Sequence, residues 1–251
     1  LQKLYQLSEN PEPQLLFTST DLEPYADQSP ILVSVDANPS ILAAVNAAPE
    51  EWPGLLLDSN GSQDLLLKHL RHILFIGFDG QRKGVLRYSN PRTASYFFPA
   101  CTQEDLLPWL GPIKALAWYG ATWRQSATKE VRWHRVENPS AAQWTPVMEP
   151  APLHLSDEQS QALSGQQTER FLYLWWEKQS VLSFQQAWVF LTEGMASDFV
   201  SAESLSGYLD LRSAYPYASQ PSGLPQGTDE YRLQYLKTSM ERSLTDKECQ
   251  A

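Results

Sequence analysis

Residues 69–92 read HLRHILFIGFDGQRKGVLRYSNPR, and this stretch decides how the first half of the chain is expected to fold. Two apolar runs, 74–78 and 84–88, flank Asp79 and Gly80. An Asp-Gly pair between such runs predicts a β-hairpin, here with a longer turn through Lys83. Pro91 cannot donate to a strand ladder, so the second strand should end there and a short helix should follow over 92–98.

Strand and helix patterns alternate on both sides of this hairpin. We expect a buried strand over 31–35, a helix over 39–48, a strand over 54–57 and a helix from the 58–62 caps to Ile73. After the hairpin, Thr102 and Asp105 form a capping-box pattern for a helix ending at Leu110. Strands follow over 113–118 and 130–136. The pattern predicts an α/β (α+β) lobe over residues 1–137, with a mixed sheet and short helices.

The composition changes after residue 137. Four prolines, Pro139, Pro146, Pro150 and Pro152, predict a Pro/Ala-rich linker over 138–155. Ser156 and Gln159 then match a capping box at the start of a long helix. Helical spacing continues from Val181, and further helices are expected over 201–215 and 229–244. Residues 156–251 are therefore predicted to form an all-helical lobe.

Charge and cysteine content limit the class of protein. A formal net charge of −10 over 251 residues argues against phosphate-backbone binding, so no nucleic-acid partner is expected. Between residues 68 and 92 there are six basic residues and only one acidic residue, Asp79. These basic residues form either a face for an anionic segment or a solvated hairpin edge. Two distant cysteines, no signal peptide and no apolar run near ~18 residues predict a cytoplasmic protein without a membrane span.

No residue pattern predicts catalysis. His69 and His72 lie three apart on a predicted helix, but a zinc site needs at least a third ligand and none is evident nearby. The glycines around Lys83 lack phosphate-loop spacing, and no Gly-x-Ser-x-Gly motif occurs. We therefore expect no enzymatic activity, no cofactor and no metal.

The run FLYLWW at 171–176 is the feature that a single core explains least. Six consecutive large apolar residues on a helix cannot all face one core, because an apolar stripe covers little more than about 100°. Either the helix is buried on several sides, or part of the run is an exposed partner surface. The partner-surface interpretation makes these aromatic side chains candidates: Tyr173, Trp175, Trp176, Tyr208, Tyr215 and Tyr217.

The first lobe resembles the effector chaperones (adaptors) of bacterial type VI secretion, a family first catalogued as a domain of unknown function. The resemblance lies in segment 69–92, in FFPA at 97–100 and in the later segment 106–112, and covers about residues 1–125. Arg87, Tyr88, Pro91 and Arg92 match the family pattern. Asn90 stands where the family usually has Asp, and the family's first strand is expected before Leu1.

The resemblance implies a role rather than a reaction. Members bind one cognate toxic effector, often through its N-terminal region, and load it onto the tip protein of the secretion spike. Arg87 and Arg92 join the candidate partner-binding residues on this ground. Two alternatives remain open: an acidic cytosolic immunity protein that inhibits a toxin, and a hydrolase with an unrecognised site.

Overall fold

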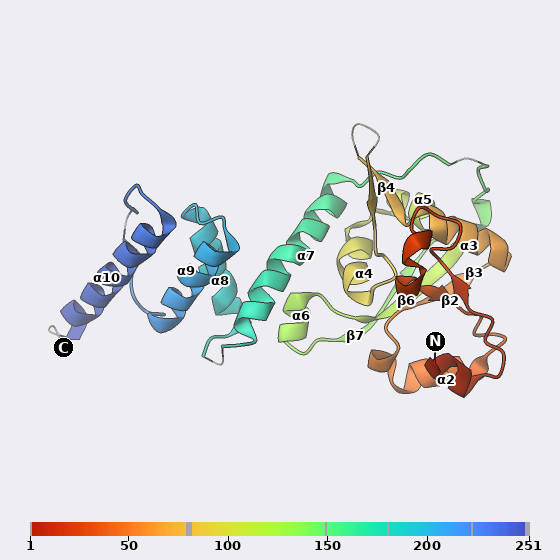
Figure 1. Cartoon of the computed structure of the whole chain (residues 1–251), viewed down its shortest axis with the longest axis horizontal. Coiled ribbons are helices and arrows are strands. Elements are labelled where there is room, and N and C mark those ends of the chain that lie inside the picture. Colours follow the sequence, from red (N-terminus) through yellow and green to blue (C-terminus); the bar gives the residue numbers. More distant parts are fainter. Residues whose placement is uncertain (1, 79–81, 149, 180, 222, 249–251) are drawn as a thin grey trace. The chain divides into compact units, whose positions relative to one another are not determined.

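The computed structural model divides the chain into two compact units, Leu1–Gln166 and Gln167–Ala251 (Figure 1). The division falls within α7 (Asp157–Trp176). Side chains are described as far as residue 243, and the described residues are 2–78, 82–148, 150–179, 181–221 and 223–248. The expected fold class is confirmed: an α/β region with small sheets and short helices precedes a helical part. The lobe boundaries expected at 137 and 156 stay a prediction.

Short antiparallel sheets form the strand layer of the first unit. Its strands are β1 (Gln14–Leu15), β2 (Ile31–Leu32), β3 (Leu55–Ser59), β4 (Phe75–Gly77), β5 (Lys83–Val85), β6 (Ile113–Gly120) and β7 (Arg132–Glu137). They pair as β1–β2, β4–β5 and a three-stranded sheet in the order β3–β6–β7. Over the described residues, the predicted single mixed sheet is therefore replaced by three separate sheets, and all of these strand pairs run antiparallel.

Short helices complete the first unit, and local capping sets where several of them begin. They are α1 (Gln2–Leu7), α2 (Pro39–Ala47), α3 (Gln63–His72), α4 (Pro91–Phe97), α5 (Gln103–Leu110) and α6 (Trp123–Ala127), with 3-10 turns η1 (Glu23–Gln28), η2 (Pro49–Glu51), η4 (Phe98–Ala100) and η5 (Ala141–Gln143). The capping box of Thr102 and Asp105 is confirmed, since each side chain accepts from the other's backbone N–H.

The predicted hairpin is confirmed as β4 and β5, although the Asp79-Gly80 turn lies outside the described residues. The far edge of β4 is also engaged. Ile76 forms a parallel bridge with Leu153, and the Gly77 N–H donates to the Leu153 oxygen at 2.8 Å. The end of the Pro-rich segment therefore packs onto the hairpin.

The strand predicted over residues 31–35 is shorter in the structure. Only Ile31 and Leu32 are in a strand, because the partner strand β1 contains just Gln14 and Leu15. Beyond Leu32 the chain turns toward α2, where the Asn38 side chain donates to the Ser34 oxygen at 2.8 Å.

The core of the first unit lies between the three-stranded sheet and helices α3, α4 and α5. Trp118 of β6 is 2 % exposed and donates from its indole N–H to Ser95 Oγ at 2.9 Å. Phe97 stacks edge-on against Trp109, with ring centres 4.8 Å apart. Aromatic pairs of this kind add to the free energy that apolar burial supplies.

Helices form the second unit: the end of α7, α8 (Phe184–Ala196), α9 (Ala202–Ala214) and α10 (Asp229–Glu248). Ser183 and Gln186 cap α8 reciprocally, and Ser201 caps α9. The core contains Leu172, Leu191, Phe199 and Leu209. Within the described part of the chain, no helix is long and apolar enough to cross a membrane.

Candidate partner-binding site

Arg92, expected at a partner surface, is half-buried and holds two parts of the first unit together. Its Nη1 lies 2.9 Å from the Ala121 oxygen, 2.8 Å from the Thr122 oxygen and 2.6 Å from Ser126 Oγ. The guanidinium also stacks over the Trp123 ring, 4.0 Å from its centre. These contacts fix the end of β6 and the start of α6, so the side chain is an internal clamp.

The other motif positions divide between core and surface. Tyr88 is buried and donates from its hydroxyl to the Leu70 oxygen at 2.8 Å, and burial raises its pKa far above the usual value. Arg71 donates to the carbonyls of Leu15 and Leu16, while Arg87 is exposed. The basic residues of 68–92 therefore do not form one continuous basic face.

The 171–176 run is buried on more than one side, as the core interpretation expects. Leu172 is fully buried and Trp175 is 8 % exposed, with its indole N–H donating to Asp210 Oδ1 at 2.8 Å. Trp176 donates to the Leu182 oxygen at 2.8 Å and lies edge-on to Phe184. Tyr173 is half-buried on the same Phe184 ring. Most of the run thus packs inside the helical unit, while Leu174 is exposed.

Tyr208 belongs to a buried polar cluster rather than to an exposed surface. Its ring is fully buried, and its hydroxyl lies 3.4 Å from Glu193 Oε2. Arg212, which is also buried, donates to the same carboxylate at 3.1 Å and to the Ala218 oxygen at 2.9 Å. Burial and the Glu193 charge raise the pKa of Tyr208 well above its usual value. The cluster pins the segment after α9 and leaves Tyr208 no exposed face.

Tyr215 and Tyr217 keep accessible surface, as the half-buried Tyr173 and Trp176 also do. Tyr217 is 83 % exposed, and Tyr215 is half-buried beside a groove. The Tyr215 hydroxyl donates to Glu241 Oε1 at 3.1 Å, and this hydrogen bond raises the pKa of the tyrosine. Partner contact at any of the candidate positions stays a prediction.

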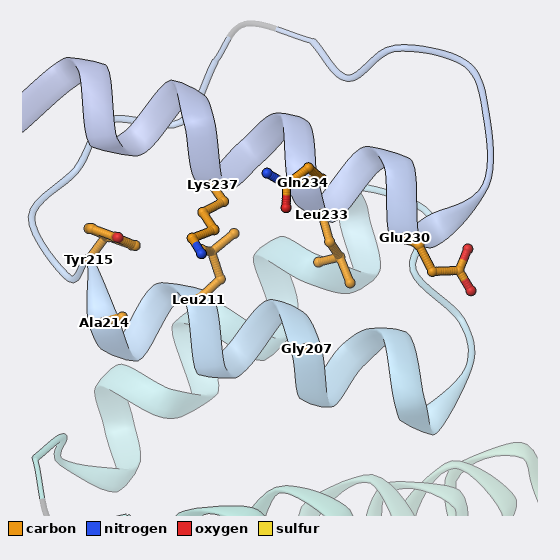
Figure 2. A pocket seen from close by; sticks show the side chains of 8 residues that line it. All are labelled: Gly207, Leu211, Ala214, Tyr215, Glu230, Leu233, Gln234 and Lys237. Atoms are coloured by element: carbon orange, nitrogen blue, oxygen red, sulfur yellow. The ribbon is translucent and has the colours of Figure 1, made fainter.

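An open groove of about 410 Å³ lies between α9 and α10 (Figure 2). Leu211 projects from α9 and Leu233 from α10 into the space between the helices, and Lys237 extends from α10 toward Leu211 and Tyr215. The lining is completed by small and polar residues: Gly207, Ala214, Glu230 and Gln234. The lining therefore mixes apolar and polar groups, with Leu211 and Leu233 as its large apolar side chains.

The two walls of the groove run in the same direction. Near one end Leu233 packs on Gly207, and near the other the side chain of Tyr215 bonds to Glu241. A side-chain carbon on Gly207 would lie 2.9 Å from Leu233 Cδ1, so a larger residue there would push this methyl group aside. The described residues of the connection, 216–221 and 223–228, run along the side of α10 that faces away from α9 in Figure 2.

The rim of the groove carries both signs of charge. Glu230 lies in the first turn of α10, where its own backbone N–H and Thr228 lower the pKa of its carboxyl. Glu241 accepts from Tyr215. Lys237 is exposed, and its ammonium forms no ion pair with any other described residue. The rim of the groove thus carries two carboxylates, Glu230 and Glu241, and one ammonium, Lys237.

Sequence reasoning found Tyr215 but missed the rest of this groove, including Leu211, Leu233 and Lys237. One signal was present: Gly207 lies inside a helical pattern, where a glycine usually marks a close packing contact. Gly207 could therefore have indicated a contact between two helices, but the sequence does not show which helix packs against it.

Of the two histidines considered as metal ligands, His69 and His72, the first packs in the core of the first unit. His69 is buried, its Nε2 lies 3.0 Å from the Trp109 oxygen, and burial lowers its pKa to about 4. Burial also lowers the pKa of His72. Burial raises the pKa of Cys101 to about 12, which keeps the thiol protonated near neutral pH. Over the described residues, no group of three or more His, Cys, Asp or Glu side chains is placed to hold a metal ion.

Residues 1–107 match a family model described as "Domain of unknown function (DUF4123)". The match includes the 69–92 hairpin and most of α5, and ends before β6. No curated protein and no solved structure matches the chain.

Proposed function

We propose that this protein is a non-enzymatic, cytoplasmic adaptor of type VI secretion, which binds a toxic effector and helps load it onto the tip protein of the spike. The observation that carries the proposal is the open groove between α9 and α10, which offers a binding surface within the helical unit. The match of residues 1–107 to the domain of unknown function supports it, together with the resemblance of segment 69–92.

The positions of the motif residues support a division of labour. Tyr88 and Arg92 hold the first unit together through backbone carbonyls, so their place in the motif follows from folding. The helical unit lies outside the matched segment and carries the groove and exposed tyrosines, Tyr217, Tyr231 and Tyr235. Tyrosine is enriched at protein interfaces because it combines a large apolar ring with a hydroxyl. Cargo choice is therefore assigned to the helical unit.

Co-expression with the toxin encoded by the neighbouring gene tests the proposal. A catalytically inactive toxin with an affinity tag should retain this protein through size-exclusion chromatography, and its soluble yield should fall when this protein is omitted. Secretion of the toxin should also require this protein. Separate elution, together with toxin yield and secretion that do not depend on this protein, would contradict the proposal.

An immunity protein is the second candidate, favoured by the net charge of −10. The same strains separate the two functions. An immunity protein protects cells that express the active toxin domain alone, whereas an adaptor raises secretion without such protection. Protection without any effect on secretion would replace the adaptor proposal with this one.

A further inference from the structure

We infer that the exposed face of α8 binds a second copy of this chain, with the two α8 helices antiparallel across a two-fold axis. The α8 face consists of four exposed residues: Gln185, Val189, Thr192 and Ala196. This inference goes beyond the proposed function and does not depend on it, because it follows from the charge, spacing and side-chain sizes of one helix.

The spacing of these four residues places them on one side of α8. They are spaced i, i+4, i+7 and i+11, so neighbouring members lie three or four residues apart and adjoin one another along the helix. At 1.5 Å per residue the α8 face is about 16 Å long, or roughly three turns. Val189 is 44 % exposed, and Met195, which flanks the face, is 49 % exposed. Apolar surface therefore remains accessible at the middle and at one edge of the face.

The exposed side of α8 carries no charge. Its exposed residues are all uncharged: Gln185, Gln186, Val189, Thr192, Met195 and Ala196. The one charged residue of the helix, Glu193, is half-buried and accepts from Arg212 and Tyr208. The other helices of the unit have charged residues at exposed positions: Arg170 on α7, Glu203 and Asp210 on α9, and Glu230 and Lys237 on α10. Uncharged exposed surface thus distinguishes α8 from its neighbours.

The charge of the whole chain favours a second copy as the occupant. Each copy has a formal net charge of −10, so two copies repel each other over most of their surface. Contact through the α8 face places no like charges side by side and takes no ion out of water. A basic partner would instead be matched by carboxylates at the contact, and the exposed residues of α8 supply none. The α8 face therefore fits another acidic chain of the same kind better than a basic protein.

The side chains of the face complement one another in an antiparallel pair. A two-fold axis between Val189 and Thr192 sets Val189 of one copy against Thr192 of the other. The same axis sets Gln185 against Ala196, so the longest side chain of the face meets the shortest. Each contact then occurs twice, as an isologous interface requires. The Thr192 hydroxyl donates to the Trp188 oxygen of its own helix at 2.9 Å, so its burial leaves no donor without an acceptor.

Sedimentation equilibrium of the purified chain tests the pairing. The unaltered chain should approach twice the monomer mass at about 200 µM and dissociate at about 1 µM, because contact through one helix gives a weak dimer. Val189→Glu should raise the dissociation constant of the dimer about tenfold or more, since it places a carboxylate without a partner in the interface. Tyr235→Glu is the matched control: this α10 side chain is 42 % exposed, and the same charge there should change the constant less than about twofold. Melting curves check that each variant is folded.

A charge-swap experiment tests the register of the two helices. Thr192→Lys alone should weaken association as Val189→Glu does. A mixture of the two variants should form a mixed dimer, because the introduced carboxylate of one copy then lies opposite the introduced ammonium of the other. An affinity tag on one variant measures this by copurification. Raising the salt to about 0.5 M should tighten the dimer of the unaltered chain, since salt screens the repulsion between acidic copies.

The remaining outcomes would overturn the inference. A chain that stays monomeric at about 200 µM contradicts it, and so does a dimer that Val189→Glu leaves intact. If each variant alone is monomeric and the mixture is too, the antiparallel pairing is wrong. If the unaltered chain is monomeric and Val189→Glu abolishes copurification of the toxin, the α8 face binds the effector rather than a second copy. The adaptor function is tested separately, by copurification of the toxin with the unaltered chain.

Discussion

The guanidinium of Arg92 lies 4.0 Å from the centre of the Trp123 ring, and its Nη1 contacts the carbonyls of Ala121 and Thr122. The side chain thus joins the start of α4 to the segment where β6 leads into α6. Hydrogen bonds from a charged donor and a cation–π contact both stabilise this junction. The motif arginine contributes to the stability of the first unit.

Arg92→Ala should lower the free energy of unfolding by about 3 kcal/mol, because it removes a charged donor from several oxygens and a stacking contact from Trp123. Urea denaturation, followed by fluorescence, measures this. Arg87→Ala is the matched control from the same motif, and the exposed side chain should change stability by less than about 0.5 kcal/mol. Equal effects of the two substitutions would refute the clamp.

Gly111→Ala should destabilise the first unit by about 2–4 kcal/mol. Gly111 ends α5 with φ of +54°, and an added side-chain carbon would lie 2.4 Å from Cε1 of the buried His69. Gly54→Ala is the control, since a carbon added there meets nothing within 4 Å. Differential scanning calorimetry compares the two. A melting temperature for Gly111→Ala that equals that of Gly54→Ala would contradict the packing described.

Stability should fall as the pH is lowered from about 6.5 to about 4. Burial lowers the pKa of His69 to about 4 in the folded chain, so the unfolded chain binds more protons across this interval. The difference is on the order of 3 kcal/mol for this group, and His72 and His134 act in the same direction. Urea midpoints from pH 7.5 to 4.5 should therefore decline more steeply for the unaltered chain than for His69→Gln. Parallel curves would be inconsistent with a buried neutral imidazole.

Trp175→Ala should cost about 3–5 kcal/mol of stability in the helical unit, because the indole is 8 % exposed and bonded to Asp210. Tyr217→Ala should leave stability unchanged, since this side chain is 83 % exposed. If Tyr217 contacts the effector, the same substitution should weaken toxin binding. Thermal unfolding and copurification of each variant make the comparison, and a stable Trp175→Ala would contradict the assignment of the run to the core.

Local signals in the sequence predicted most of the elements. Thr102 with Asp105, and Ser156 with Gln159, gave helix starts that the reciprocal hydrogen bonds confirm. Thr122 and Gln125 form the same capping pattern at the start of α6. This helix was nevertheless not predicted, because it has only five residues. Capping depends on neighbours within three residues, so a sequence shows it directly.

Contacts between distant residues could not be predicted in this way. His69 meets Trp109 forty positions later, and this contact makes it a core residue rather than a ligand candidate. The groove depends on α9 and α10 running parallel, which requires a connection that returns along the length of α10. Periodicity shows which face of a helix is apolar, but it does not show which helix covers that face.

Hydrogen–deuterium exchange of the chain with and without the inactive toxin tests most directly the central claim, that the helical unit binds the effector. Backbone amides of 207–217 and 230–241 should exchange more slowly in the complex, because a bound effector segment would cover both walls of the groove. Amides of β6 and β7 should not change. Protection confined to the first unit, with unchanged exchange in α9 and α10, would contradict the account.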